Sequence, residues 1–291
     1  MPGAADFIRA GLAHLDGDFD DPRAHVSLHG TSLFSLYRVA TNGLVLGAKL
    51  MDDESMARTE ARGLQALRAT GARVPEVFGV YAEAGRVALY MEFVEAGSTL
   101  AAGAARNDLL NSLEALYRSG RERWGLEYDN FIGSLPQKNG QFDSFTEFWW
   151  EARIRPMAAE AVRRRHLTPA HQDRLREVVF TMSTRWNLDA AGPRLIHGDL
   201  WSGNVLAGKD GMFLIDPSVA ASHPEQDFGM LLLFGSPLKL DDLESLGRKL
   251  GFAPGLAERI PFWQLYPLLV HVNIFGASYV SSVERELRAY E

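Results

Sequence analysis

Residues 194–217 read RLIHGDLWSGNVLAGKDGMFLIDP. Asp199 is followed after five residues by Asn204, and after twelve more by Asp216. Short apolar runs before Asp199 and before Asp216 are typical of strands. The pattern predicts a loop that carries a carboxylate and an amide, followed by a second carboxylate at a strand end.

Such a set of side chains suits phosphoryl transfer from ATP. One Asp accepts or orients the proton of the attacking hydroxyl, while an Asn and a second Asp hold the Mg²⁺ that bridges the phosphates. Because the transition state is mostly charge on oxygen, positioning and electrostatics supply most of the catalysis. The alternative is a polar loop in which Asn and Asp only form turns. The combination of HGD with IDP favours the kinase-type site.

The bulk properties of the chain narrow the class of protein. With 291 residues and 46% apolar residues, it is long enough for two domains or one bilobal unit. Its formal charge of −7 argues against nonspecific nucleic-acid binding. The absence of cysteine excludes disulfides and thiol chemistry. Neither a signal peptide nor a membrane-spanning run is recognisable, so a cytoplasmic protein is expected.

The first part of the chain reads as a small sheet with helices. Apolar spacing predicts a short opening helix around Phe7 and Leu15 and a second helix over residues 53–69. The Asn42-Gly43 pair favours a hairpin turn between two antiparallel strands. Strands are expected at residues 25–29, 33–40, 44–50, 77–81 and 86–93.

After residue 95 the spacing of apolar residues becomes helical. Helices are expected at residues 105–118, 145–165, 169–188, 227–233, 240–250 and 261–288, with residues 129–140 as a loop. The predicted fold is therefore α+β and bilobal, like that of protein kinases. A nucleotide-binding lobe spans residues 1–94, a helical catalytic and acceptor-binding lobe spans residues 95–291, and ATP is expected in the cleft between them.

The first lobe offers a candidate cation for the nucleotide phosphates. Lys49 lies near the end of the third strand, from which a lysine can reach the α- and β-phosphates. Glu60 on the following helix is the natural carboxylate to hold it, although Glu54 is also available. The alternatives are a solvated strand-end charge and an exposed helix face.

Two further segments are expected to contact the nucleotide. Gly30, Thr31 and Ser32 lie between the first two strands and could bind phosphate through backbone N–H groups and hydroxyls. A single glycine makes this a poor glycine-rich loop, and an ordinary hairpin connection is equally consistent. Glu92 and Phe93 begin the connector between the lobes, where backbone groups could hydrogen-bond adenine.

Three blocks of sequence resemble the fructosamine/ketosamine kinase family, within the wider aminoglycoside-phosphotransferase-like group. They are residues 129–156, DNFIGSLPQKNGQFDSFTEFWWEARIRP, residues 195–206, LIHGDLWSGNVL, with the IDP segment that follows, and residues 262–279, FWQLYPLLVHVNIFGASY. HGD and IDP are shared across the larger group. The Trp after HGDL and the IGSLPQ block are more specific to ketosamine kinases.

The resemblance implies ATP- and Mg²⁺-dependent phosphorylation of a sugar hydroxyl on a ketosamine, a glycation adduct of an amine. By position, Asp199 becomes the catalytic base, and Asn204 and Asp216 become metal ligands. The chain also departs from the family, because its phosphate loop has less glycine and no cysteine. Where members carry a tyrosine pair and a basic residue after IDP, this chain has Ala220, Ala221 and Pro224. These departures concern the acceptor more than the reaction.

Four residues are candidates for the acceptor pocket. Trp201 follows the catalytic loop and could stack on a sugar face or on the amine, although a core position is the alternative. Asn130 and Gln137 lie in the family-specific block, where loop capping is the alternative. Asp227 begins a helix, so it could also cap that helix or contact the catalytic loop.

Three other functions are consistent with the same sequence. A kinase for aminoglycosides, choline or homoserine would use the same fold and site. A pseudokinase that binds nucleotide without turnover is favoured only by the weak phosphate loop. A metal-dependent hydrolase could also use HGD and Asp216, but it would need a larger cluster of ligands.

Overall fold

The computed structural model describes residues 3–15, 17–97 and 100–290 of the chain. It divides into two compact units, one of Met1–Ala105 with Leu206–Pro217, the other of Arg106–Val205 with Ser218–Glu291. These units differ from the predicted lobes because the segment 206–217, which carries Asp216, is grouped with the first unit. In the described ranges no helix is long and apolar enough to cross a membrane.

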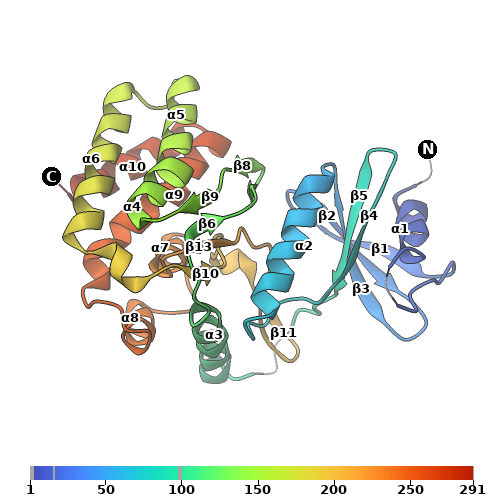
Figure 1. Cartoon of the computed structure of the whole chain (residues 1–291). Helices are drawn as coiled ribbons and strands as arrows, with labels where there is room; N and C mark the ends of the chain where they lie inside the picture. The colour runs from blue at the N-terminus through green and yellow to red at the C-terminus, as the bar shows by residue number, and fades with distance from the viewer. Residues whose placement is uncertain (1–2, 16, 98–99, 291) are drawn as a thin grey trace. The chain divides into compact units, whose positions relative to one another are not determined.

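The first unit is built on a five-stranded antiparallel sheet in the order β1-β2-β3-β5-β4 (Figure 1). In β2 and β3, Ser35 pairs with Leu50 and Ala40 with Val45, which confirms the hairpin predicted from Asn42-Gly43. All five predicted strands form, with ends shifted by a few residues. Their bounds are β1 His25–Thr31, β2 Ser35–Ala40, β3 Val45–Met51, β4 Val77–Glu83 and β5 Arg86–Glu92.

Two helices cover opposite faces of this sheet, α1 (Ala4–Leu12) and α2 (Glu54–Arg68). Alternation along β5 directs Tyr90 into the core under α1 and Leu89 into the core under α2. Asp53 caps α2 by accepting hydrogen bonds from the backbone N–H groups of Ser55 and Met56. The same alternation in β3 places Lys49 on the α2 side, which is how a charged strand residue reaches Glu60.

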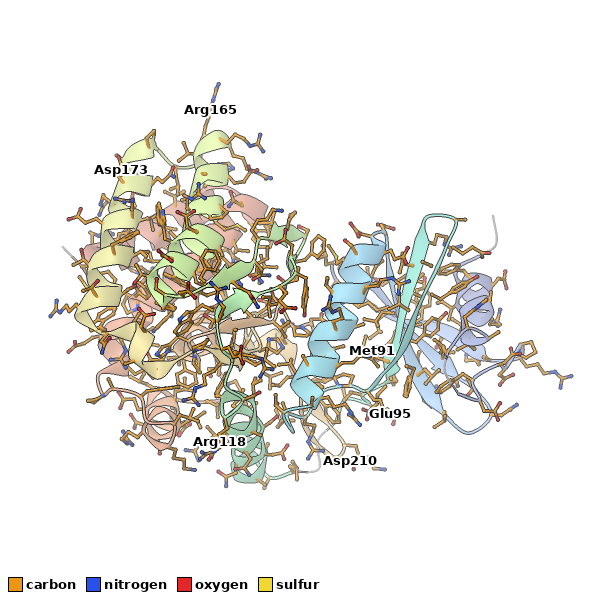
Figure 2. All side chains as sticks on the ribbon, in the orientation of Figure 1. Met91, Glu95, Arg118, Arg165, Asp173 and Asp210 are labelled. Atoms are coloured by element: carbon orange, nitrogen blue, oxygen red, sulfur yellow. The ribbon has the colours of Figure 1, made fainter. Side chains whose placement is uncertain are left out.

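A β-hairpin completes the first unit. It consists of β11 (Val205–Gly208) and β12 (Gly211–Leu214), whose turn carries Asp210 (Figure 2). Leu214 donates its backbone N–H to the carbonyl of Arg73, and Gly97 donates to that of Ala207. These bonds tie the strand before Asp216 to the first unit.

The second unit is mainly helical around a small sheet. Short strands form a four-stranded sheet in the order β10-β13-β6-β9, and β7 and β8 form a separate hairpin. These strands are β6 Trp124–Leu126, β7 Asn130–Ile132, β8 Leu135–Gln137, β9 Gly140–Phe142, β10 Arg194–Ile196 and β13 Ala220–Ser222. The helices are α3 Ala102–Tyr117, α4 Phe145–Phe148, α5 Arg155–Arg163, α6 Pro169–Arg185, α7 Glu225–Leu233, α8 Leu240–Lys249, α9 Leu256–Phe275 and α10 Val280–Arg288.

Three predictions for the second unit need correction. The helix expected over residues 145–165 contains a π-helical turn, Trp149–Ile154, between α4 and α5. The helix expected over 261–288 begins earlier and breaks at Gly276, whose φ of 85° favours glycine. The loop expected over 129–140 contains the β7–β8 hairpin. Beyond the end of α5, Arg165 points away from the unit, as Figure 2 shows.

Candidate functional site

A cluster of three charged side chains lies in the first unit. The ammonium of Lys49 is 2.8 Å from one carboxylate oxygen of Glu60 and 3.0 Å from Oδ1 of Asp216. Burial alone would lower the pKa of Lys49, but the two carboxylates outweigh burial and raise it. Lys49 therefore stays protonated at neutral pH, and the structure brings together three of the residues predicted from the sequence.

Asp216 is more open than the pair that it contacts. Its side chain is 42% exposed, against 9% for Lys49 and 10% for Glu60. Its backbone has a φ of 53°, a left-handed conformation that Asp tolerates better than most residues. The carboxylate thus lies at the end of β12 with one oxygen on Lys49 and access to solvent. A carboxylate of this kind suits a hard divalent cation.

The predicted phosphate loop is the exposed tip of the β1–β2 hairpin. A bulge between Leu28 and Gly30 interrupts the pairing, and Ser32 donates its backbone N–H to the carbonyl of Phe34. The Phe34 ring centroid lies 5.3 Å from the Lys49 ammonium, which fits a cation–π contact. A methyl group on Gly30 would meet nothing within 4 Å, so the fold itself does not require glycine there.

The residues predicted to contact adenine lie where β5 ends. Glu92 donates its backbone N–H to the carbonyl of Glu76, so this amide hydrogen is already used inside the first unit. Phe93 packs edge-on against His29 of β1, with ring centroids 4.8 Å apart. Figure 2 labels Met91 and Glu95 on either side of this segment. An adenine contact from Glu92 or Phe93 stays a prediction.

The second unit carries residues 197–204, the segment predicted to be the catalytic loop and called by that name below. Asn204 donates its side-chain N–H to the backbone carbonyl of Asp199 at 2.8 Å and to Oδ2 of Asp199 at 3.2 Å. This orientation commits the amide nitrogen to Asp199 and leaves the amide oxygen available as a ligand. Each of the two predicted ligands suits Mg²⁺ by itself, because Asn204 offers a carbonyl oxygen and Asp216 a carboxylate. In the described ranges no cluster of three or more acidic or histidine side chains could hold a metal by itself.

Buried hydrogen bonds hold the backbone of this loop. Asp227 accepts the backbone N–H groups of His197 and Gly198, each at 2.8 Å, and the hydroxyl of Tyr117 at 3.0 Å. Ser218 donates its backbone N–H to the carbonyl of His197 at 2.9 Å. Burial raises the pKa of Asp227 to about 6, against the effect of the three hydrogen bonds. Asp227 is fully buried, which fits contact with the loop rather than with a substrate.

The other acceptor candidates divide into buried and exposed residues. Asn130 and Gln137 are only 4% and 1% exposed, and their amides bond to each other and to Ser218 and Val219. Trp201 is 38% exposed, and its ring lies against Gly203, where an added methyl would collide with it. Trp201 is therefore the member of the set that is free to meet a ligand.

Several residues that support the loop were not expected from the sequence. Gly198 has a φ of 83°, and a methyl group there would lie 1.9 Å from the carbonyl oxygen of Ser218. The glycine in HGD was the one available signal, since positive φ favours glycine. Phe234 accepts a hydrogen bond from the Ser202 hydroxyl and packs on His271, with ring centroids 4.5 Å apart. Phe275, 60% exposed, continues this aromatic group beside the loop.

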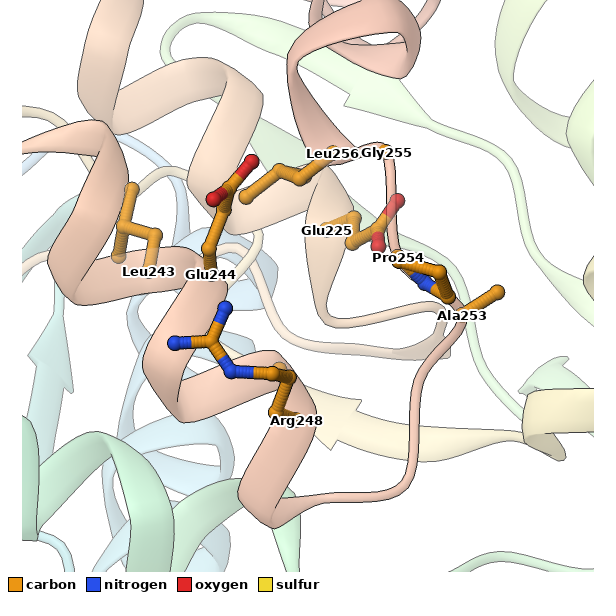
Figure 3. A pocket seen from close by; sticks show the side chains of 9 residues that line it. Glu225, Leu243, Glu244, Arg248, Ala253, Pro254, Gly255 and Leu256 are labelled. Carbon is orange, nitrogen blue, oxygen red and sulfur yellow. The ribbon is translucent and has the colours of Figure 1, made fainter.

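A small recess of about 40 Å³ lies elsewhere in the second unit (Figure 3). Glu225 lies at its wall and is held by Arg259 in a buried ion pair at 2.6 Å. Glu244 and Arg248 of α8 lie on the other side. None of the residues predicted for the site lines this recess, so it is distinct from the catalytic loop.

The chain is similar to known proteins over most of its length. A family model described as fructosamine kinase matches residues 14–290. A probable ketoamine kinase of Thermus thermophilus is 32% identical over 90% of this chain and 92% of that relative. A chloroplastic protein-ribulosamine 3-kinase of Oryza sativa subsp. indica is 31% identical over 84% of this chain and 69% of that relative.

The chain is also similar to solved structures. One from Thermobifida fusca, assigned as a fructosamine-3-kinase, has a TM-score of 0.85 and 34% identity, with 98% of each chain covered. An aminoglycoside phosphotransferase, APH(4)-Ia, has a TM-score of 0.64 at 12% identity over 98% of each chain, which shows the fold alone. The predicted kinase-like α+β fold is thus confirmed, and the chain belongs to the fructosamine kinase family.

Proposed function

We propose that this chain is an ATP-dependent kinase that phosphorylates a sugar hydroxyl of a ketosamine, such as a ribulosamine or fructosamine adduct of an amine. The observation that carries the kinase assignment is the Lys49 ammonium bound between Glu60 and Asp216. A lysine fixed in this way can engage the phosphates of ATP. The ketosamine assignment rests on the names of the relatives and on membership of the family.

The loop residues have separate roles in the proposed reaction. The bond between the γ-phosphorus and its bridging oxygen breaks, a bond to the acceptor oxygen forms, ADP leaves, and the hydroxyl proton passes to the carboxylate of Asp199. Asn204 restrains that carboxylate through its amide hydrogen. Mg²⁺, held by Asn204 and Asp216, would neutralise charge that develops on the phosphate oxygens.

The remaining nucleotide contacts are proposed from position. Backbone groups of Gly30, Thr31 and Ser32 would cover the phosphates, and Glu92 and Phe93 would border the adenine. The Phe34 ring over Lys49 supports this placement of the hairpin tip.

On the acceptor side, we assign direct contact to Trp201 and a supporting role to Asn130, Gln137 and Asp227. The exposed ring of Trp201 is close in sequence to Asp199 and can stack on a sugar face. The other three are buried, and their polar atoms bond inside the protein. A cytoplasmic location is part of the same proposal.

The experiment is a measurement of ADP release with Mg²⁺-ATP and a panel of acceptors. The panel contains ribulosamine and fructosamine adducts of lysine, aminoglycosides, choline and homoserine, and Asp199→Asn provides the blank. Turnover confined to ketosamines supports the proposal, with a loss of about 10²–10⁴-fold in the variant because the base is removed. Turnover only with another acceptor would replace the substrate class and keep the reaction. ATP binding without turnover on any acceptor would favour a pseudokinase.

A further inference from the structure

An arginine outside the predicted site has an unusual environment in the second unit. Arg153 is fully buried, and its guanidinium lies over the rings of Phe148 and Tyr266, at 4.7 and 5.8 Å from their centroids. Among the described residues, no carboxylate forms an ion pair with it. A buried charge without a direct ion pair is costly, so its hydrogen-bond partners matter more than usual, and the negative charge of Asp129 acts on Arg153 without such a pair.

The partners of Arg153 lie in the turn between β8 and β9. Its guanidinium donates to the backbone carbonyl of Lys138 at 2.8 Å and to Oδ1 of Asn139 at 2.9 Å. Arg153 belongs to the π-helical turn that interrupts the expected helix. π-Helical turns are rare in proteins, and those that do occur are often found at functional sites. The turn places the guanidinium of Arg153, which can only donate, against the side-chain amide of Asn139. That amide could otherwise adopt either of its two orientations.

This donor fixes the direction of a chain of amide hydrogen bonds. Because arginine has no acceptor, Asn139 must present its oxygen to it. The nitrogen of Asn139 then donates to Oδ1 of Asn130 at 2.8 Å, and the nitrogen of Asn130 donates to the backbone carbonyl of Val219 at 2.9 Å. Reversing any one amide would oppose two like groups, so the order of donors propagates from Arg153 to Val219.

Gln137 and its two other side-chain partners brace the same chain of bonds. Gln137 donates to Oδ1 of Asn130 and to the hydroxyl of Ser218, both at 2.9 Å, and it accepts the hydroxyl of Tyr266 at 2.6 Å. Ser218 then donates its backbone N–H to His197, the first residue of the catalytic loop. The amide chain therefore ends on the backbone against which the catalytic loop is held.

An electrostatic link joins the same residues. Burial raises the pKa of Tyr266, Arg153 lowers it, and the negative charge of Asp199 raises it again. Arg153 and the expected base thus act on one phenol from opposite directions.

We propose that Arg153 is a positioning residue for the kinase reaction. By directing the hydrogen bonds Arg153 to Asn139 to Asn130 to Val219, it fixes the Ser218–Val219 backbone and, through it, the loop that carries Asp199. This inference rests on the proposed function for its kinetic consequences. Its structural consequence, order in the loop, does not depend on which acceptor is used.

The test uses Asn139→Asp, because Arg153→Ala would leave a cavity and unpaired carbonyls and could simply fail to fold. The introduced carboxylate would still accept from Arg153 and would give it a counter-ion, which offsets part of the cost of the lost bond to Asn130, so the variant should stay folded. It cannot donate to Asn130, whose amide must then reverse or lose its partner. Lys138→Met is the matched control, because it alters the same turn at an exposed side chain outside the chain of bonds.

Two readouts are measured for the wild type and both variants. With a ketosamine acceptor, Asn139→Asp should lower kcat at least tenfold while KM for ATP stays within twofold, and Lys138→Met should change neither. Amide hydrogen exchange, which needs no substrate, should increase over residues 195–201 and 216–220 in Asn139→Asp only. Unchanged exchange in that stable variant would overturn the proposal, and so would unchanged kcat. Absence of turnover in the wild type would overturn the proposed function instead, and exchange would then decide this inference.

Discussion

The two units build their parts of the candidate site in opposite ways. In the first unit, Lys49, Glu60 and Asp216 meet through charge, and Asp216 remains open to solvent. In the second unit, the catalytic loop is held by buried hydrogen bonds to backbone groups from Asp227 and Ser218. Because Asp216 is exposed, we expect the first arrangement to exchange partners when nucleotide binds. The second is built to stay fixed during the reaction.

The largest effect is expected for Gly198→Ala, in the hydrogen-bonded loop of the second unit. The added methyl would lie 1.9 Å from the carbonyl oxygen of Ser218, and the backbone has a φ of 83°. Because backbone must move to accommodate it, we expect a loss of about 4 kcal/mol or more in the free energy of unfolding. Urea unfolding measures this loss, and ADP release should fall to the blank.

Gly251→Ala is the control for backbone strain without a clash. Gly251 has a φ of 81°, and a methyl there would meet nothing within 4 Å. It should cost only about 1 kcal/mol, the usual penalty of a left-handed conformation. Equal losses in the two variants would show that strain, and not the contact with Ser218, sets the requirement for glycine in HGD.

The charged cluster should respond differently to substitution. Lys49→Met leaves the carboxylate of Glu60 buried without its partner, which should cost about 3 kcal/mol of unfolding free energy. Replacing both, as Lys49→Met with Glu60→Leu, should recover most of that loss, because the pair is removed together. Both variants should lose affinity for ATP, measured by calorimetry. A double variant with wild-type ATP affinity would remove Lys49 from the nucleotide site.

The sequence predicted the charged cluster better than the buried supports, for a physical reason. Lys49 on a strand and Glu60 on the next helix are positioned by alternation and by helical spacing over long segments. The strands of the five-stranded sheet have six or seven residues, so their period is visible. Asp53 also bonds to near neighbours in the sequence, because it caps α2 through the backbone of Ser55 and Met56. These features depend on neighbours along the chain, which the sequence displays directly.

The missed features depend on contacts between distant segments. β6, β9 and β13 have three residues each, too few for a period to appear, and their pairing is non-local. The π-helical turn at Arg153 is stabilised by contacts with Lys138 and Asn139, so a helical pattern alone could not reveal it. No pattern in the sequence marks Ser218, although its backbone supports His197. Short strands and side-chain networks are therefore visible only in the folded chain.

A smaller effect is expected from pH, through a buried histidine near α7. Burial lowers the pKa of His223 to about 4, from about 6.5 in the unfolded chain. Between these values the unfolded chain binds the extra proton, so stability is full above pH 6.5 and falls as the pH approaches 4. At about pH 5 this loss should be about 2 kcal/mol.

His223→Asn is the variant that isolates this contribution, because it cannot titrate. The raised pKa of Asp227 acts in the opposite sense, since its protonation below about pH 6 favours the folded chain. Glu225, Arg259 and Arg194 also act on His223, and they remain in the variant. Urea unfolding measures how much unfolding free energy is lost between about pH 7 and about pH 5. This loss should be about 2 kcal/mol smaller in His223→Asn than in the wild type. An identical pH dependence in both proteins would mean that His223 titrates normally.

The smallest effect should appear at the exposed ring beside the catalytic loop. Trp201 is 38% exposed, so its removal costs little packing, but a sugar stacked on it would lose that contact. Trp201→Ala should raise KM for a ketosamine by about tenfold, equivalent to about 1.4 kcal/mol, and leave KM for ATP unchanged. Phe180→Ala is a matched control, because Phe180 in α6 is also 38% exposed and lies outside the loop. If both variants change KM alike, the effect comes from loss of a surface ring in general. If only Trp201→Ala raises KM for the ketosamine, and Trp201→Phe restores most of the loss, then the aromatic ring at position 201 stacks on the acceptor. The loop would in that case combine a fixed backbone with one adaptable side chain.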